Sequence, residues 1–195
     1  MSVYVRSYSD IEVRRDEILR YAGIKQTNEE LDSLIDSCLD EILSKLMYKV
    51  CFSECDVSRV GDGVCFGNVK STSKTLKRKL DGCETAIVFA ATLGLEIDRL
   101  IARYGHVSPS RALIFQAIGA ERIEAVCDAF CADIAKEKCK NVTSRVSPGY
   151  SDIPLSMQKD IFAYLDCPRR LGLTLNESLI MSPSKSVSAI FGVGG

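Results

Sequence analysis

A long apolar segment predicts one helix that runs through the middle of the fold. Pro109 suits the first turn of a helix, where a missing N–H costs nothing, and Arg111–Ile134 is apolar nearly all round. A helix without a polar face has to be surrounded by other parts of the chain. The rest of these 195 residues, 46% of them hydrophobic, is therefore expected to pack around it as one domain.

The N-terminal part predicts two further helices. Two Ser/Thr-x-x-Glu capping boxes, at Ser9–Glu12 and Thr27–Glu30, indicate where they start, and Gly23 fits the end of the first. In the second, apolar residues recur with helical spacing from Leu31 to Leu46.

Strand patterns appear after Lys45 and again at the end of the chain. The predicted elements are two short strands within Lys45–Gly67, a basic helix over Ser71–Leu80, a buried strand over Glu84–Gly94 running into a helix, a short helix around Gln158–Leu165, a strand-like LIM segment ending at Met181, a Ser182-Pro183 turn, and a last strand from Ser186. These elements predict an α+β fold with a twisted, mostly antiparallel sheet packed against helices. We expect a single domain over 1–195, with a helical part at 1–46 and an α+β core at 47–195.

Charge and hydropathy exclude several classes of protein. With 25 Lys+Arg against 26 Asp+Glu, the chain lacks the positive excess of a nucleic-acid-binding or polybasic membrane-binding protein. No apolar run approaches the roughly 18–20 residues of a transmembrane helix. The N-terminus is polar and mixed in charge, unlike a signal peptide. We therefore expect a cytoplasmic protein.

Nine cysteines are an unusual number for such a chain. Most lie in apolar patterns, which favours reduced, buried thiols. No CxxC occurs, and the two CxxxC pairs, Cys51/Cys55 and Cys127/Cys131, have only His106 to add as a further ligand. No metal site is therefore predicted, and a thiol-based redox or metal protein is the least favoured hypothesis.

Two charged stretches each allow two interpretations. Five positive charges lie between Lys70 and Lys79, and a solvated helix face is favoured over an anionic partner. Glu121, Glu124 and Asp128 share one face of the central helix. That row is either the solvent-exposed side of the helix or a set of carboxylates facing a cationic ligand.

Common catalytic motifs are missing, and a binding motif is present. The sequence has no GxSxG, P-loop, HExxH or GxGxxG. In the RVSPGY segment, Arg145 offers a planar fork for a carboxylate or phosphate. Pro148-Gly149 predicts a tight turn that a ligand can approach, and Tyr150 adds a flat face with a hydroxyl. These residues predict a site for a flat molecule that carries a carboxylate.

The segment RVSPGYSDIPLSMQKDIFAYLD and the later LGLTLNESLIMSPSKSVSAIFG resemble the C-terminal activation domain of cobalamin-dependent methionine synthase. That family carries R-x-x-P-G-Y and, further on, G-x-x-LTES-x-x-M-x-P-x-x-SVSG. The dense match covers about 50 residues, and a weaker one extends upstream to roughly residue 60. The layout is closer to small stand-alone members than to the fused domain.

The resemblance implies binding of S-adenosylmethionine and its presentation to cobalamin on a partner. By position, Arg145 corresponds to the arginine that holds the methionine carboxylate, and Ser147 and Gly149 to backbone contacts with the nucleoside. Tyr150 corresponds to the tyrosine between ligand and corrin, and Glu124 to a helix glutamate at the ligand's cationic end, with Asp128 or Glu121 as alternatives. Ser186 and Ser188 are further corrin-facing candidates.

The favoured hypothesis is therefore a reactivation subunit, a component of a methyltransferase rather than a complete enzyme. Its expected partners are a corrinoid-binding methionine synthase module or another corrinoid protein, and flavodoxin or another electron donor. Departures from the family pattern support an alternative. The chain ends at Gly195 without the family's further tyrosine-bearing segment, Ala189 replaces a glycine, and Asn176 replaces a threonine. The alternative is a non-catalytic corrinoid-protein interaction module that has lost S-adenosylmethionine binding.

Overall fold

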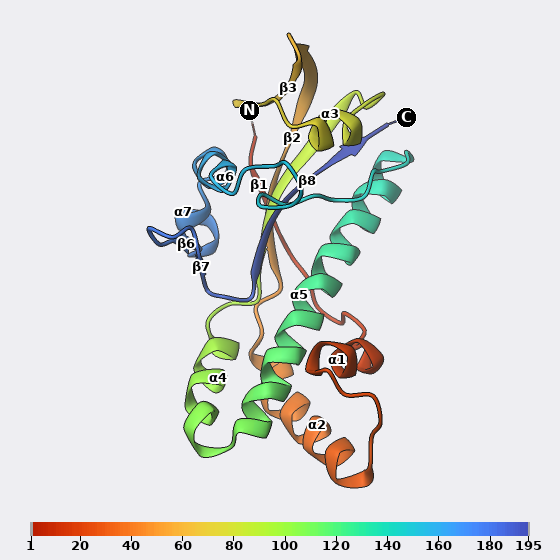
Figure 1. The fold of residues 1–195 in the computed structure, drawn as a ribbon. Helices are drawn as coiled ribbons and strands as arrows, with labels where there is room; N and C mark the ends of the chain where they lie inside the picture. Colours follow the sequence, from red (N-terminus) through yellow and green to blue (C-terminus); the bar gives the residue numbers. More distant parts are fainter. Residues whose placement is uncertain (1, 195) are drawn as a thin grey trace.

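A six-stranded antiparallel sheet forms the centre of the computed structural model, which describes residues 2–194 (Figure 1). The strand order is β4-β3-β2-β5-β8, and β1 also pairs with β2. The strands are β1 (Tyr4–Ser7), β2 (Lys49–Val60), β3 (Gly63–Phe66), β4 (Val69–Ser71), β5 (Thr85–Thr92) and β8 (Ser186–Val193). The predicted α+β class with a mostly antiparallel sheet is confirmed.

β5 is an interior strand of the sheet, and its composition explains why. It pairs with β2 from Thr85↔Asp56 to Thr92↔Lys49 and with β8 on its other side. Its side chains are buried on both faces, which accounts for an unbroken apolar run in place of the alternation of a half-exposed strand.

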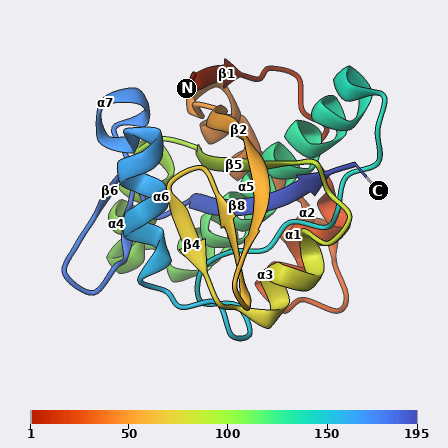
Figure 2. The same ribbon diagram turned by 90° about the horizontal axis from the view of Figure 1, so that it is seen from above.

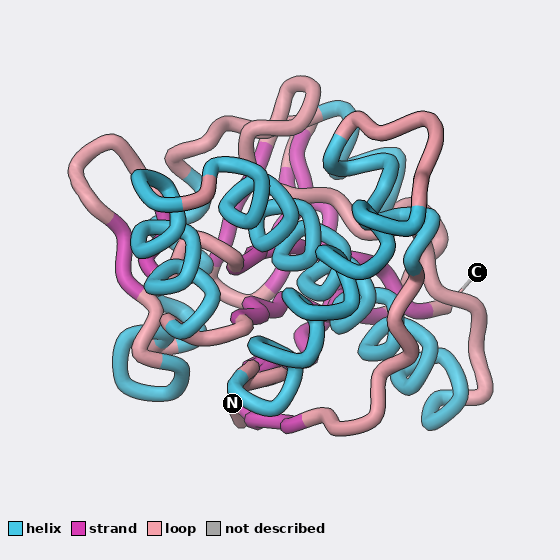
Figure 3. Tube along the Cα trace, turned by 90° about the horizontal axis from the view of Figure 1, so that it is seen from below, coloured by secondary structure: helices cyan, strands magenta, loops and turns pink. Residues whose placement is uncertain are grey.

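The 30-residue helix α5 (Pro109–Lys138) joins two parts of the core. Its C-terminal half packs Ile123, Val126 and Phe130 against one face of the sheet. Its N-terminal half packs into a helical cluster with α1 (Arg15–Ala22), α2 (Glu29–Ile42) and α4 (Glu96–Val107). In the view from below, helices cover this end of the molecule and strands lie behind them (Figure 3). The predicted central helix is therefore confirmed.

The other face of the sheet is covered by α6 (Met157–Leu165) and α7 (Cys167–Leu171), together with α3 (Lys74–Lys79). Seen from above, the strands lie between α6 and α5 (Figure 2). The remaining elements are a 3-10 turn, Leu43–Lys45, after α2 and a small hairpin of β6 (Thr174–Leu175) and β7 (Met181–Ser182).

Several local predictions differ from the structure. The first of the two predicted short strands is β2, which has 12 residues, and Ser71 belongs to β4 rather than to the predicted basic helix. The Ser9–Glu12 box starts no helix, because α1 begins only at Arg15 and the preceding segment is held against α5 by Arg122. Asn28 caps α2 in place of Thr27, since its side chain accepts the Leu31 N–H. Within the LIM segment only Met181 lies in a strand, β7, which pairs with β6 outside the main sheet.

Residues 1–46, expected to be helical, also contain a strand. Tyr4–Ser7 forms β1 and pairs with β2 from Tyr4↔Phe52 to Ser7↔Lys49. Four residues next to a polar segment carry too weak a periodic pattern to predict a strand.

The cysteines are all free, and five of the nine are buried. Burial raises the pKa of Cys55 to about 11 and also raises the pKa of Cys127. Within residues 2–194 no group of three or more His, Cys, Asp or Glu side chains could hold a metal ion. None of the helices in that range combines the length and apolar character of a membrane-crossing segment.

Candidate ligand-binding site

The segment after α5 runs along the outer edge of β8. Val142 and Val146 form bridges to Val193 and Ile190. The Val146 N–H donates to the Ile190 carbonyl at 2.9 Å, and the Ile190 N–H donates back at 2.9 Å. Successive side chains of an extended segment point to opposite faces. Val146 packs into the core on the α6 side of the sheet, so its neighbour Arg145 points toward α5.

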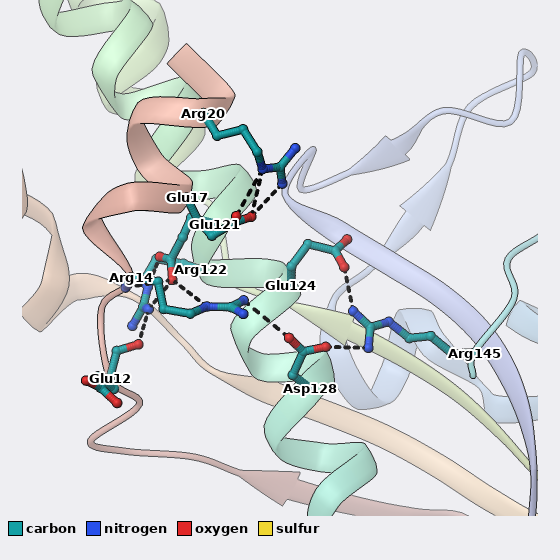
Figure 4. Close-up of polar contacts among 9 residues, drawn as sticks. All are labelled: Glu12, Arg14, Glu17, Arg20, Glu121, Arg122, Glu124, Asp128 and Arg145. Atoms are coloured by element: carbon teal, nitrogen blue, oxygen red, sulfur yellow. Dashed lines mark hydrogen bonds and ion pairs between the residues drawn. The ribbon is translucent and has the colours of Figure 1, made fainter. Parts of the chain in front are cut away.

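Arg145 meets two carboxylates of α5. Its Nη2 lies 2.5 Å from Glu124 Oε2, and its Nη1 lies 2.6 Å from Asp128 Oδ1 (Figure 4). Burial alone would lower the pKa of Arg145, but the hydrogen bonds to Asp128 and Glu124 outweigh it and raise the pKa. The structure thus brings together the predicted Arg145, Glu124 and its alternative Asp128, with the arginine charged.

Glu121, the third carboxylate of the row, is fully buried, so the row is not simply the exposed side of the helix. It pairs with the equally buried Arg122, whose Nη2 lies 2.5 Å from Glu121 Oε1. The Arg122 Nη1 also donates to the Ile11 carbonyl at 2.7 Å. Glu121 therefore helps to attach the N-terminal segment to α5.

Two arginines of this network, Arg14 and Arg122, were not predicted. Arg14 Nη2 lies 3.2 Å from Asp128 Oδ2 and extends the charge network to the start of α1. An arginine within an apolar helix is a sequence signal for a buried ion pair, and it could have identified Arg122. Nothing in the sequence places Arg14 beside Asp128, because the two residues are far apart along the chain.

The predicted Pro-Gly turn follows Arg145 directly. The Tyr150 N–H donates to the Ser147 carbonyl at 3.1 Å, and Gly149 has φ +88°, which favours glycine. A Cβ at Gly149 would lie 3.3 Å from Leu155. Tyr150 is 62% exposed, so this residue is open to a ligand or partner.

Asp152 anchors this turn to the start of α3. Its carboxylate accepts the Ser73 hydroxyl at 2.7 Å and the Lys74 and Thr75 N–H groups at 2.6 and 3.2 Å. Hydrogen bonds from Thr75 and Ser73 hold the pKa of Asp152 well below its usual range.

Ser186 and Ser188 lie apart from this turn, on the buried strand β8. The Ser186 hydroxyl lies 2.8 Å from both Thr92 Oγ1 and the Pro183 carbonyl. A corrin-facing role would require both hydroxyls to become accessible, and it stays a prediction.

The charges of the site form a chain of contacts that alternates in sign, from Arg14 through Asp128 and Arg145 to Glu124 (Figure 4). Guanidinium groups bind carboxylates through paired hydrogen bonds, and carboxylates bind ammonium groups. The arrangement is therefore suited to the carboxylate and ammonium of an amino acid.

Comparison with protein families matches residues 73–194 to the family described as "Vitamin B12 dependent methionine synthase, activation domain". Among solved structures, the chain is similar to the "Crystal Structure of the MetH Reactivation Domain bound to AdoHcy", with a TM-score of 0.76 and 17% identity. The similarity covers 100% of this chain and 79% of that chain, and at this identity it shows the fold alone. Comparison with curated proteins gave no significant match.

Proposed function

Because the chain belongs to the family of vitamin B12-dependent methionine synthase activation domains, we propose that it reactivates a cobalamin-dependent methionine synthase or a related corrinoid methyltransferase. In this proposal it binds S-adenosylmethionine and presents it to cobalamin on a partner. The observation that carries the proposal is the contact of Arg145 with Glu124 and Asp128 directly before the exposed Tyr150 turn.

The chemistry of these side chains fits the amino-acid end of S-adenosylmethionine. Arg145 binds the ligand carboxylate, and Glu124 binds the ligand ammonium and lies close to the sulfonium. Binding then exchanges the Arg145–Glu124 ion pair for two ion pairs with the ligand, while Asp128 keeps its contact with Arg14. The similar MetH reactivation domain is bound to AdoHcy, the demethylated form of this ligand, which supports the assignment.

The Pro-Gly turn serves the rest of the ligand. Ser147 and Gly149 offer backbone groups to the nucleoside, and the absent side chain at Gly149 permits a close approach. Tyr150 lies between ligand and corrin. Bound S-adenosylmethionine would supply a methyl group on a good leaving group. The protein contributes orientation, holding the methyl group toward the partner's cobalt.

The partner follows from the same proposal. A corrinoid-binding module of methionine synthase, or another corrinoid protein, brings the cobalamin. Flavodoxin or an equivalent donor brings the electron that accompanies methyl transfer. We place the complex in the cytoplasm.

Calorimetric titration with S-adenosylmethionine tests the site. We expect saturable binding to the wild-type chain and a loss of about 2 kcal/mol or more, roughly 30-fold, in Arg145→Ala, because a charge-assisted contact is removed. Arg59→Ala is a matched control, since Arg59 also pairs with a carboxylate, Asp81, but on the far end of β2. Its affinity should equal that of the wild type.

Unchanged affinity in Arg145→Ala would refute the assignment of the site. Absence of wild-type binding at millimolar ligand would refute the proposed function. Retention by an immobilised corrinoid protein would then identify the alternative, an interaction module whose Arg145 stays paired with Glu124 and Asp128.

A further inference from the structure

Arg14 and Arg145 share one carboxylate from opposite sides. Asp128 Oδ1 lies 2.6 Å from Arg145 Nη1, and Asp128 Oδ2 lies 3.2 Å from Arg14 Nη2. The two arginines come from distant parts of the chain, one at the start of α1 and one beside β8. In Figure 4 their side chains approach Asp128 from the two sides of α5.

A buried ion pair fixes the backbone at Arg14. Arg122 and Glu121 are fully buried, and Arg122 donates to the carbonyls of Ile11 and Glu12. Glu121 Oε1 in turn accepts the Arg14 N–H at 3.1 Å. The backbone of Arg14 is therefore held against α5, and its side chain starts from a fixed position.

The guanidinium of Arg14 keeps an unused donor. Its Nε is buried and has no hydrogen-bond partner among residues 2–194, because Glu121 Oε1 lies 3.7 Å away. Buried donors are normally satisfied. The Asp128 carboxylate at Nη2 is therefore the closest acidic partner of this guanidinium.

The shared carboxylate has a consequence for ligand binding. When Arg145 turns to a ligand carboxylate, Asp128 loses one of its two cations. With Arg14 present Asp128 keeps the other, so releasing Arg145 costs less free energy. Without Arg14, Asp128 would depend on Arg145 alone and compete directly with the ligand.

We propose that Arg14 is a positioning residue of the ligand site, which holds Asp128 while Arg145 binds the carboxylate of the ligand. This inference rests on the proposed function, because it needs a ligand with an amino-acid end. It extends the site from α5 and the Arg145 loop to the segment that precedes α1.

Titration with S-adenosylhomocysteine tests the proposal on the full chain and the variants Arg14→Gln and Arg14→Lys. We expect Arg14→Gln to weaken binding about 10-fold, the effect of one charge-assisted contact. Arg14→Lys should recover most of the affinity, because it keeps the positive charge. Arg6→Gln is the matched control: Arg6 also links the N-terminal segment to α5, through Glu137 at 2.9 Å and Asp133 at 3.6 Å.

A double-mutant cycle separates positioning from a general structural effect. If Arg14 acts through Asp128, Arg14→Gln should have little further effect in the Asp128→Asn background. Equal wild-type and Arg14→Gln affinities would overturn the inference. The inference would also be overturned if Arg6→Gln lost as much affinity as Arg14→Gln. The same holds if Arg14→Gln lowered the affinity by the full amount in the Asp128→Asn background. Absence of wild-type binding would instead refute the proposed function, and the inference with it.

Discussion

At the scale of single residues, some side chains of the candidate site can be predicted from the sequence and others cannot. The RVSPGY motif and the spacing of the carboxylates on α5 indicate Arg145 and Glu124, and the structure places them 2.5 Å apart. A local sequence pattern depends only on residues that are close along the chain. Helical spacing therefore indicates which carboxylates of α5 share a face. Arg14 comes to Asp128 only through the fold, so no local pattern could reveal it.

The buried Glu121–Arg122 pair leads to a prediction about stability. Glu121→Ala leaves the Arg122 charge buried without its carboxylate, which costs about 3–5 kcal/mol. Urea unfolding of wild type and variant measures this loss. The control is Glu137→Ala, which removes a half-exposed partner of Arg6 on the same helix and should cost about 0–1 kcal/mol. Equal losses of unfolding free energy in the two variants would show that the buried pair stabilises the fold no more than the exposed one.

At the scale of elements, the prediction succeeded where local signals are strong. The apolar run of β5 and Pro109 at the start of α5 each act within a few residues. The prediction failed for β1, which depends on pairing with β2. It also failed for the start of α1, because Arg122 holds the segment before that helix. It also missed α7, whose five residues are too few for a periodic pattern.

Asp152 links two elements in a way that depends on pH. Its pKa is lowered in the folded chain, so its contribution to stability is complete above its unfolded pKa, about 3.9, and is lost as the pH falls toward the folded value. We predict that Asp152→Asn lowers stability at pH 7 and that its difference from wild type narrows at pH 3. Urea unfolding at both pH values measures this. Asp160→Asn, on α6, serves as control, and a gap of equal size at both pH values would contradict the linkage.

At the scale of the whole molecule, α5 connects the helical end to the sheet, because both clusters contain its side chains. We propose on this ground that residues 1–195 form one domain. The proposed ligand site lies along α5, where Arg14 of the N-terminal segment and Arg145, beside β8, both contact Asp128. A single helix thus supplies both the support of the core and the carboxylates of the site.

The activity that we propose for this chain is the delivery of a methyl group from S-adenosylmethionine to the cobalamin of a partner. The most direct measurement combines the chain with the cobalamin-binding module of a vitamin B12-dependent methionine synthase in its cob(II)alamin form. A chemical reductant and S-adenosylmethionine labelled with ¹⁴C in its methyl group complete the mixture. We predict that label appears on cobalamin only when the chain is present, and that Arg145→Ala abolishes the transfer. Equal labelling with and without the chain, or no labelling with it, would refute the proposed methyl transfer.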